Sequence, residues 1–139
     1  MTRSEILDFV RKNRTSHMAT LENGEPRVRA MDTPVVDDSG LIFLTGSVKS
    51  VCKQLIADPS VELSYLDSES GVQLRIRGRM ERLDDQDMKK QIVETRFTFL
   101  KPIAERFGWD AFVLFRLSSG TASTWSGADS GGGVETFTY

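Results

Sequence analysis

Hydrophobic residues alternate with polar ones over most of the chain, and this pattern predicts β-strands. In VQLRIRGRMERL, Leu74 and Ile76 point to one face of the strand and the arginines beside them to the other, as a sheet with one wet face requires. The Asn23-Gly24 pair predicts a hairpin turn, because both residues accept positive φ. The predicted strands are TSHMATL (15–21), PRVRAMDTPVV (26–36), LIFLT (41–45), VELSYLD (61–67), VQLRIRGRMERL (72–83), AFVLFRL (111–117) and TASTW (121–125).

Helical spacing interrupts this pattern at three points. Thr2 and Glu5 form a capping box for a short first helix. A second helix is predicted to begin at Val48 and to end before Pro59, because a proline disfavours helical backbone in the residue that precedes it. Residues 84–107 predict one or two helices whose hydrophobic side chains cover the sheet.

The C-terminal stretch SGADSGGGVETFTY differs from the rest of the chain, since four glycines precede an alternating end. The glycines predict a flexible link. The final VETFTY predicts either a docked strand or an arm that reaches a partner, because frayed termini rarely alternate with aromatic residues.

The strands and helices together predict a mostly β fold with flanking helices. Six or seven antiparallel strands, with a helix inserted after the third, favour a small barrel, because a barrel closes its own edges. A chain of 139 residues is most simply one domain, 1–139, with a substantial core.

Composition narrows the classes of function. A net charge of −2 argues against broad attraction to nucleic acid or to an anionic membrane, so any anion site must be local. No segment approaches the length of a membrane span and the N-terminus has no secretory pattern, so a cytoplasmic location is expected. Cys52 and His17 are the only residues of their types, so we predict no metal site and no catalytic dyad or triad.

The junction FLTGSVKSVCKQL (43–55) passes from a strand to a helix and is rich in hydrogen-bond donors. Gly46 would let the backbone fold so that the N–H groups of the first helical turn point at one spot. Ser47 and Ser50 would add hydroxyl donors, and Lys49 would add a full positive charge. This combination suits a phosphate group.

Two arginines on the preceding strand extend the same hypothesis. Arg27 and Arg29 lie on one face of that strand and would add two more charges if that face lies beside the loop. The alternative is that Ser47 only caps the helix, while Lys49 and the two arginines are solvated surface charges. The junction alone leaves both interpretations open.

The surrounding segments resemble the FMN-binding split-barrel superfamily, typified by pyridoxamine 5'-phosphate oxidase and the general stress protein 26 group, the latter a stress-response family. The resemblance runs from the first helix to about Gly127. It rests on PRVRAMDTPVV, LIFLTGSVKSVCKQLIADPSVEL and VQLRIRGRMERL, in the order and spacing of the family. It implies a split barrel, FMN as cofactor, and a homodimer in which two subunits enclose each flavin.

The resemblance also implies which residues hold FMN. Arg29 and Lys49 would bind its phosphate with Ser47, whereas Gln73 and Trp125 would reach the flavin from the partner subunit. On pattern alone, Gln73 is equally a solvent-facing strand residue and Trp125 an ordinary core or interface aromatic. With the junction residues, the candidate cofactor-binding set is Arg27, Arg29, Ala30, Met31, Asp32, Leu44, Thr45, Gly46, Ser47, Val48, Lys49, Ser50, Gln73 and Trp125.

The sequence departs from the family downstream of the late tryptophan. Pyridoxamine phosphate oxidases carry an Arg-x-His element there that holds the substrate, whereas GADSGGGVETFTY has neither arginine nor histidine. The resemblance therefore favours an FMN-dependent oxidoreductase acting on another small molecule, with NADH or NADPH as a candidate donor, and disfavours vitamin B6 oxidation. The alternative is a non-catalytic FMN carrier, sensor or electron-transfer module. Either fits the lack of a catalytic dyad, because the flavin ring itself accepts the electrons.

Overall fold

The computed structural model describes residues 1–126 and 134–138. Its strands are β1 (Thr15–Glu22), β2 (Glu25–Asp32), β3 (Val35–Asp37), β4 (Gly40–Gly46), β5 (Ser60–Leu66), β6 (Gln73–Arg79), β7 (Glu81–Leu83), β8 (Phe112–Leu117), β9 (Ser119–Trp125) and β10 (Val134–Thr138). Its helices are α1 (Arg3–Lys12), α2 (Ser50–Ala57), α3 (Gln86–Thr95) and α4 (Lys101–Phe107), with short 3₁₀ turns η1 (Thr98–Leu100) and η2 (Trp109–Ala111).

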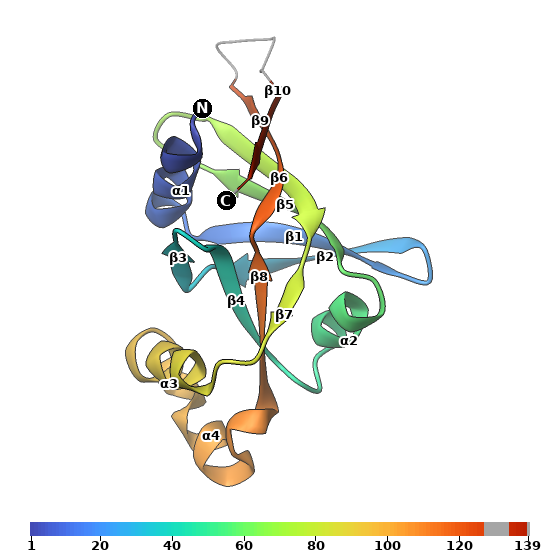
Figure 1. Ribbon diagram of the computed structural model, residues 1–139, viewed down its shortest axis with the longest axis vertical. Coiled ribbons are helices and arrows are strands. Elements are labelled where there is room, and N and C mark those ends of the chain that lie inside the picture. The colour runs from blue at the N-terminus through green and yellow to red at the C-terminus, as the bar shows by residue number, and fades with distance from the viewer. Residues whose placement is uncertain (127–133, 139) are drawn as a thin grey trace.

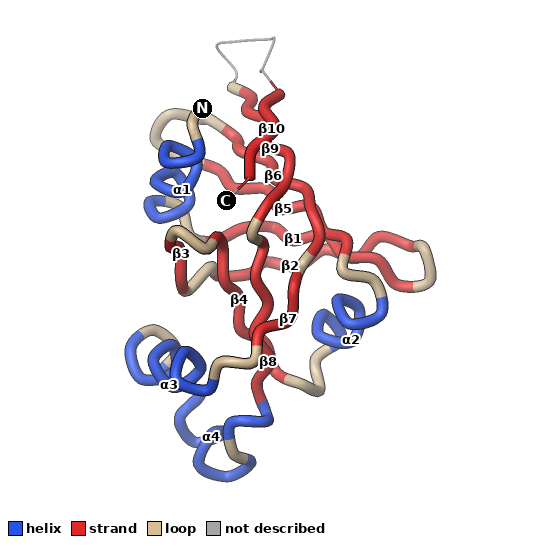
Figure 2. Tube along the Cα trace, in the orientation of Figure 1, coloured by secondary structure: helices blue, strands red, loops and turns tan. Residues whose placement is uncertain are grey.

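The described strands pair antiparallel into two sheets (Figure 1). The larger sheet has the order β10-β9-β6-β5-β1-β2, and the smaller has the order β3-β4-β8-β7. The mostly β fold with flanking helices is confirmed, as Figure 2 shows. Within the described residues, however, the hydrogen-bond ladders form two sheets and do not close into the single barrel that the strand pattern favoured.

Two segments predicted as single long strands are each divided between the sheets. The chain leaves the larger sheet after β2, passes Pro34, and enters the smaller sheet as β3. Proline has no N–H for a ladder, which accounts for the break. The chain leaves the larger sheet again after β6 and enters the smaller as β7 beyond Met80. Alternation continues through both breaks, so the hydrophobic pattern alone predicted fewer and longer strands.

A glycine makes the second crossing possible. A Cβ atom on Gly78 would lie 2.7 Å from the backbone oxygen of Ser119 and 2.8 Å from Cδ1 of Leu117. Both distances are shorter than real Cβ contacts. Gly78 therefore allows the end of β6 to pass closely by the point where β8 continues into β9.

The main core lies beneath α1. This helix begins as predicted, with the Thr2 hydroxyl accepting a hydrogen bond from the Glu5 N–H at 3.2 Å. Its buried side chains, among them Ile6, belong to one cluster with Met18 of β1 and residues of both sheets. The hairpin between β1 and β2 is also confirmed, because Asn23 and Gly24 both have positive φ.

A second core lies beneath α3 and α4, which sit together at the end of the molecule opposite the N-terminus (Figure 1). Ile92 and Val93 of α3 and Ala104 of α4 pack with Leu44 and Leu114 of the smaller sheet. The prediction of one or two sheet-covering helices in 84–107 is thus confirmed, with α3 and α4 separated by η1. This pair of helices forms one side of the site described below.

The final residues pair with the larger sheet. β10 runs antiparallel to β9, with Val134 opposite Ser123 and Thr138 opposite Ser119. Of the two predictions for the C-terminal end, the docked strand is therefore confirmed. The glycines predicted as a flexible link, at 127 and 131–133, lie outside the described residues. Within the described part of the chain, the helices lack the length and hydrophobicity needed to cross a membrane.

Candidate functional site

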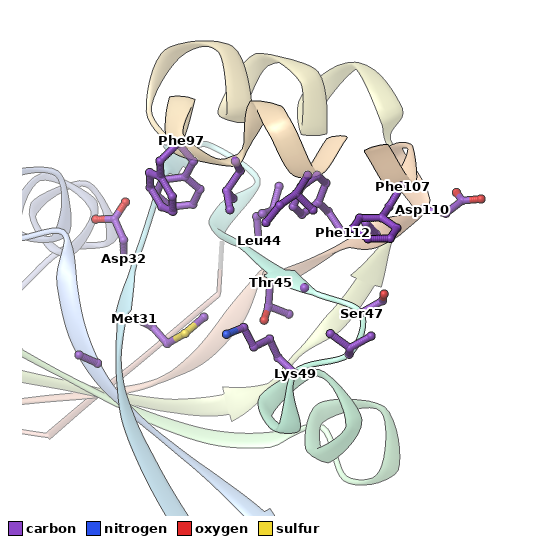
Figure 3. A pocket seen from close by; sticks show the side chains of 17 residues that line it. Met31, Asp32, Leu44, Thr45, Ser47, Lys49, Phe97, Phe107, Asp110 and Phe112 are labelled. Carbon is purple, nitrogen blue, oxygen red and sulfur yellow. The ribbon is translucent and has the colours of Figure 1, made fainter. Parts of the chain in front are cut away.

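A cavity of about 770 Å³ opens between the ends of β2 and β4, the loop that follows β4, and the segment from residue 97 to residue 112 (Figure 3). Two parts of the predicted FMN set meet there, one from β2 of the larger sheet and one from β4 of the smaller sheet and the loop after it. The candidate residues that line the cavity are Ala30, Met31, Asp32, Leu44, Thr45, Gly46, Ser47, Val48 and Lys49.

The opposite wall is hydrophobic and was not assigned to the site from the sequence. It consists of Phe97, Phe99, Leu100, Ile103, Phe107, Ala111 and Phe112, with Asp110 at one end. Figure 3 places Phe97, Phe107 and Phe112 beneath the helical segment, facing Thr45 and Met31 across the cavity. The phenylalanines at 97 and 99 are two residues apart, so a single helical face could not bury both. This spacing in the sequence indicated that one of the two aromatic side chains would lie outside the protein core.

The helix after the loop begins later than predicted. α2 starts at Ser50, and its N-cap residue Lys49 makes no side-chain capping bond. The predicted start at Val48 is wrong, because Val48 lies in the turn that precedes the helix, where 81% of its surface is exposed. The Ser47 cap is also wrong, since Lys49 holds the N-cap position. The Ser47 N–H instead donates to the carbonyl oxygen of Ala111 at 2.8 Å and holds the loop against the segment after α4.

The start of α2 nevertheless provides donors. The first intrahelical hydrogen bond runs from the Lys53 N–H to the Lys49 carbonyl oxygen. The N–H groups of Ser50, Val51 and Cys52 precede that bond and have no acceptor within the helix. They lie at the positive end of the helix dipole, directly after the cavity-lining lysine. Ser50 itself does not line the cavity.

Lys49 carries the positive charge of the cavity. Its ammonium group points into the cavity, toward Met31 and Thr45 (Figure 3). Within the described residues it has no side-chain hydrogen bond or ion pair, and it is the one cationic residue that lines the cavity. A Cβ atom on Gly46 would lie 3.3 Å from Cγ of Lys49, so Gly46 gives the lysine room to cross the loop.

Arg29 lies against α2 and outside the cavity lining. Its guanidinium donates to the Thr20 hydroxyl at 2.7 Å, to the Met18 carbonyl oxygen at 3.2 Å and to Oε1 of Gln54 at 2.6 Å. Partial burial lowers the pKa of Arg29. This side chain therefore fixes α2 against β1 and β2 at a distance from the cavity lining.

Arg27 is also outside the cavity. It lies 3.4 Å from carboxylate oxygens of both Glu22 and Glu25, in the hairpin between β1 and β2. The hypothesis from the sequence required Arg27 and Arg29 to face the loop after β4. Neither arginine lines the cavity beside that loop. One cation, rather than three, faces the space.

Gln73 and Trp125 lie together but away from the cavity. They stand directly opposite one another on β6 and β9. The Gln73 amide donates to the hydroxyl of Ser64 at 3.2 Å, and half of the Trp125 surface is exposed. Neither residue lines the cavity of its own chain.

An ion pair closes one edge of the cavity. The guanidinium of Arg96, the residue that ends α3, contacts both carboxylate oxygens of Asp32. The Asp32 carboxylate raises the pKa of Arg96. The pair joins the last residue of β2 to the helical wall and compensates the charge of the Asp32 carboxylate.

Other candidate chemistry is sparse in the described residues. No group of three or more metal-ligating side chains is present among them. Cys52 is buried in the main core and His17 is exposed on β1, so neither lies in the cavity. The cavity residues can therefore bind and orient a molecule that brings its own reactivity.

The protein is thus a mostly β domain with two antiparallel sheets and a hydrophobic cavity that ends at a lysine. Its family follows from the sequence. The profile described as pyridoxamine 5'-phosphate oxidase matches residues 2–122, so the chain belongs to this family. The resemblance noted from the three sequence segments is confirmed.

Solved structures share the fold at low sequence identity. A NimC/NimA family protein from Clostridium acetobutylicum is 22% identical, with a TM-score of 0.77 over 96% of this chain and 91% of that one. A protein related to general stress protein 26, also from Clostridium acetobutylicum, is 17% identical, with a TM-score of 0.72 over 96% and 93%. A FAD-binding protein from Mesorhizobium loti is 18% identical, with a TM-score of 0.64 over 91% and 96%. A comparison with curated proteins gave no significant match.

Proposed function

We propose that this protein is an FMN-dependent oxidoreductase that acts on a small molecule other than a vitamin B6 phosphate. The observation that carries the proposal is the arrangement of the cavity, with hydrophobic walls along its length and Lys49 beside the start of α2 at one end. Its volume of about 770 Å³ lies within the usual range of cofactor sites. Membership of the family and the fold shared with a FAD-binding protein support a flavin.

The residues of the cavity fit the two parts of FMN. The isoalloxazine ring is flat and mostly hydrophobic, and Met31, Leu44, Phe97 and Phe112 would contact it. The phosphate would lie near Lys49 and the first N–H groups of α2, where charge and dipole both favour an anion. FMN, when bound, supplies hydride or single-electron transfer at its own ring.

The protein's own residues would orient the ring and exclude water. Phe97 and Phe112 would shield one side of the site, and the Asp32–Arg96 ion pair would hold the helical wall on the sheet. NADH or NADPH is the proposed electron donor. The vitamin B6 reaction is disfavoured, because Lys49 is the one cation in the described lining and a phosphorylated substrate would require a second.

We further propose that a second copy of the chain completes the site. Gln73 and Trp125 belong to the candidate set but lie outside the cavity of their own subunit, where half of the tryptophan surface is exposed. In a homodimer, these two neighbouring side chains would contact the flavin held by the partner. Light scattering coupled to size exclusion, with and without FMN, measures the state of association directly.

An absorbance spectrum and a fluorescence titration test the proposal. The purified protein is expected to be yellow or to bind added FMN, and to be bleached by NADH or NADPH with turnover on an acceptor. Failure to bind FMN would overturn the proposed function. Tight binding without turnover would instead favour the alternative of an FMN carrier, sensor or electron-transfer module.

A further inference from the structure

Exposed hydrophobic side chains that do not belong to the protein core lie at the mouth of the cavity. Phe99 is 72% exposed and Phe107 is 63% exposed, and Ile103 between them is 41% exposed. All three line the cavity. Exposed hydrophobic side chains gathered beside a cavity are typical of a binding surface.

The aromatic rings at this mouth are held by their neighbours. The Phe97 and Phe99 ring centroids are 5.8 Å apart and tilted by 53°, which is a favourable aromatic contact. The guanidinium of Arg106 lies 5.0 Å from the centroid of Phe107. Arg106 itself does not line the cavity. The mouth therefore presents positioned rings rather than loose side chains.

The charges in the cavity are unfavourable for an anionic substrate. Asp32 is already paired with Arg96. Under the proposed function, Lys49 pairs with the phosphate of FMN. The remaining charged residue of the described lining is Asp110, whose carboxylate lies at the Phe107 end. The guanidinium of Arg106 lies on the Phe107 ring but outside the cavity lining, so an anion in the cavity at this end would meet the Asp110 carboxylate and no cation of the described lining.

We propose that Phe99, Ile103 and Phe107 form the substrate subsite, and that it takes a planar aromatic molecule with no negative charge. The ring of the substrate would pack against the phenylalanines in offset or tilted contact, next to the flavin. This inference rests on the proposed function, because it requires Lys49 to be occupied by the cofactor.

A pair of probes with the same ring separates charge from shape. 2-Naphthol and 2-naphthyl phosphate differ only in the phosphate group, and their binding to the full chain is measured by titration calorimetry, with and without FMN. In the FMN-loaded protein, 2-naphthol is expected to bind at least about tenfold more tightly. Without FMN, this preference should shrink or reverse, because Lys49 is then available to the phosphate.

Substitutions test the location of the subsite. Phe99→Ser and Phe107→Ser should each weaken 2-naphthol binding by about fivefold or more, while the affinity for FMN changes less than about twofold. Ile56→Ser is the matched control, since Ile56 is 56% exposed on α2 and lies outside the cavity. It should leave both affinities unchanged.

The outcomes distinguish this inference from the proposed function. If FMN binds but 2-naphthyl phosphate binds as tightly as 2-naphthol, or if neither phenylalanine substitution alters 2-naphthol binding, the inference is overturned while the flavin site stands. If FMN does not bind, the proposed function is overturned. A loss of 2-naphthol binding in the Phe99 and Phe107 variants without FMN would then still support an aromatic subsite at this mouth.

Discussion

Arg96 donates to both carboxylate oxygens of Asp32, and this contact joins residues that are 64 positions apart in the chain. Asp32 ends the edge strand β2 and Arg96 ends α3, so the pair fixes the helical wall of the cavity on the larger sheet. The Asp32 side chain is 23% exposed and the Arg96 side chain is 40% exposed. A partly exposed pair of this kind contributes little to overall stability but can define local geometry.

Asp32→Asn should therefore affect the cavity more than the fold. We expect a loss of no more than about 1 kcal/mol in the free energy of unfolding. We also expect faster amide hydrogen exchange in residues 96–100, because the end of α3 loses its contact with β2. Asp8→Asn is the control, since it removes an exposed carboxylate–arginine pair within α1. Equal exchange in both variants would contradict this role.

Lys49→Met should weaken FMN binding by about tenfold, because a charge-assisted contact with phosphate is lost at an exposed site. Lys53→Met is the matched control, since Lys53 lies one turn further along α2 and does not line the cavity. Fluorescence titration with FMN at two salt concentrations measures the effect. The difference between the variants should shrink at high salt. Equal affinities for both variants would refute the assignment of Lys49.

Substitutions at two glycines should affect different properties, stability at Gly78 and FMN binding at Gly46. Gly78→Ala should lower the free energy of unfolding by about 1–3 kcal/mol, because the new Cβ would overlap the backbone of Ser119. Gly46→Ala should change stability little, because its Cβ would lie 3.3 Å from the flexible side chain of Lys49 and at an ordinary contact distance of 3.9 Å from the Ala111 carbonyl oxygen. It should instead weaken FMN binding by displacing that lysine. Urea unfolding and FMN titration of both variants check this contrast.

Tyr65 should make stability depend on alkaline pH. Its hydroxyl is buried against the Thr33 hydroxyl at 2.7 Å, and burial raises the pKa of Tyr65 well above its ordinary value. An unfolded tyrosine loses its proton near pH of about 10, whereas the folded one keeps it. The stabilisation that protonated Tyr65 gives the folded state is therefore fully present below a pH of about 10. It is lost progressively as the pH rises above that value, because the unfolded state then releases its proton first.

The measurement for Tyr65 compares urea unfolding of the wild-type protein and of Tyr65→Phe at pH values from about 8 to about 11. This range includes the ordinary pKa of an unfolded tyrosine, which is about 10. The phenylalanine variant cannot ionise at this position. Its stability should fall less steeply above about pH 10. Parallel stability curves for the two proteins would show that Tyr65 does not control this pH dependence.

Trp125→Ala should weaken FMN binding even though Trp125 lies outside the cavity of its own subunit. A buried aromatic contact from a partner is worth a loss of about tenfold or more when it is removed. Ile56→Ala serves as the control, because that residue is similarly exposed and lies on α2. FMN titration, together with light scattering to measure association, checks this prediction. A monomeric protein with unchanged FMN affinity would exclude the contribution from a partner.

The sequence by itself determined the features that depend on neighbouring residues. Asn23 and Gly24 specify their turn through their own φ preferences, and Thr2 caps the helix that it precedes. Proline after Asp58 ends α2 where predicted. The lysine and loop of the candidate site also follow from the order of residues, because the strand, glycine and helix that position Lys49 are consecutive.

The tertiary structure decided what depends on distant partners. Whether Arg29 faces the cavity depends on Gln54, which lies in another element and accepts its hydrogen bond. The hydrophobic wall of the cavity depends on how α3 and α4 dock, because only packing selects which phenylalanines enter the core and which remain at the mouth. The division of strands between two sheets has the same cause. Alternation fixes which side chains share a face, but pairing with distant strands decides to which sheet that face belongs.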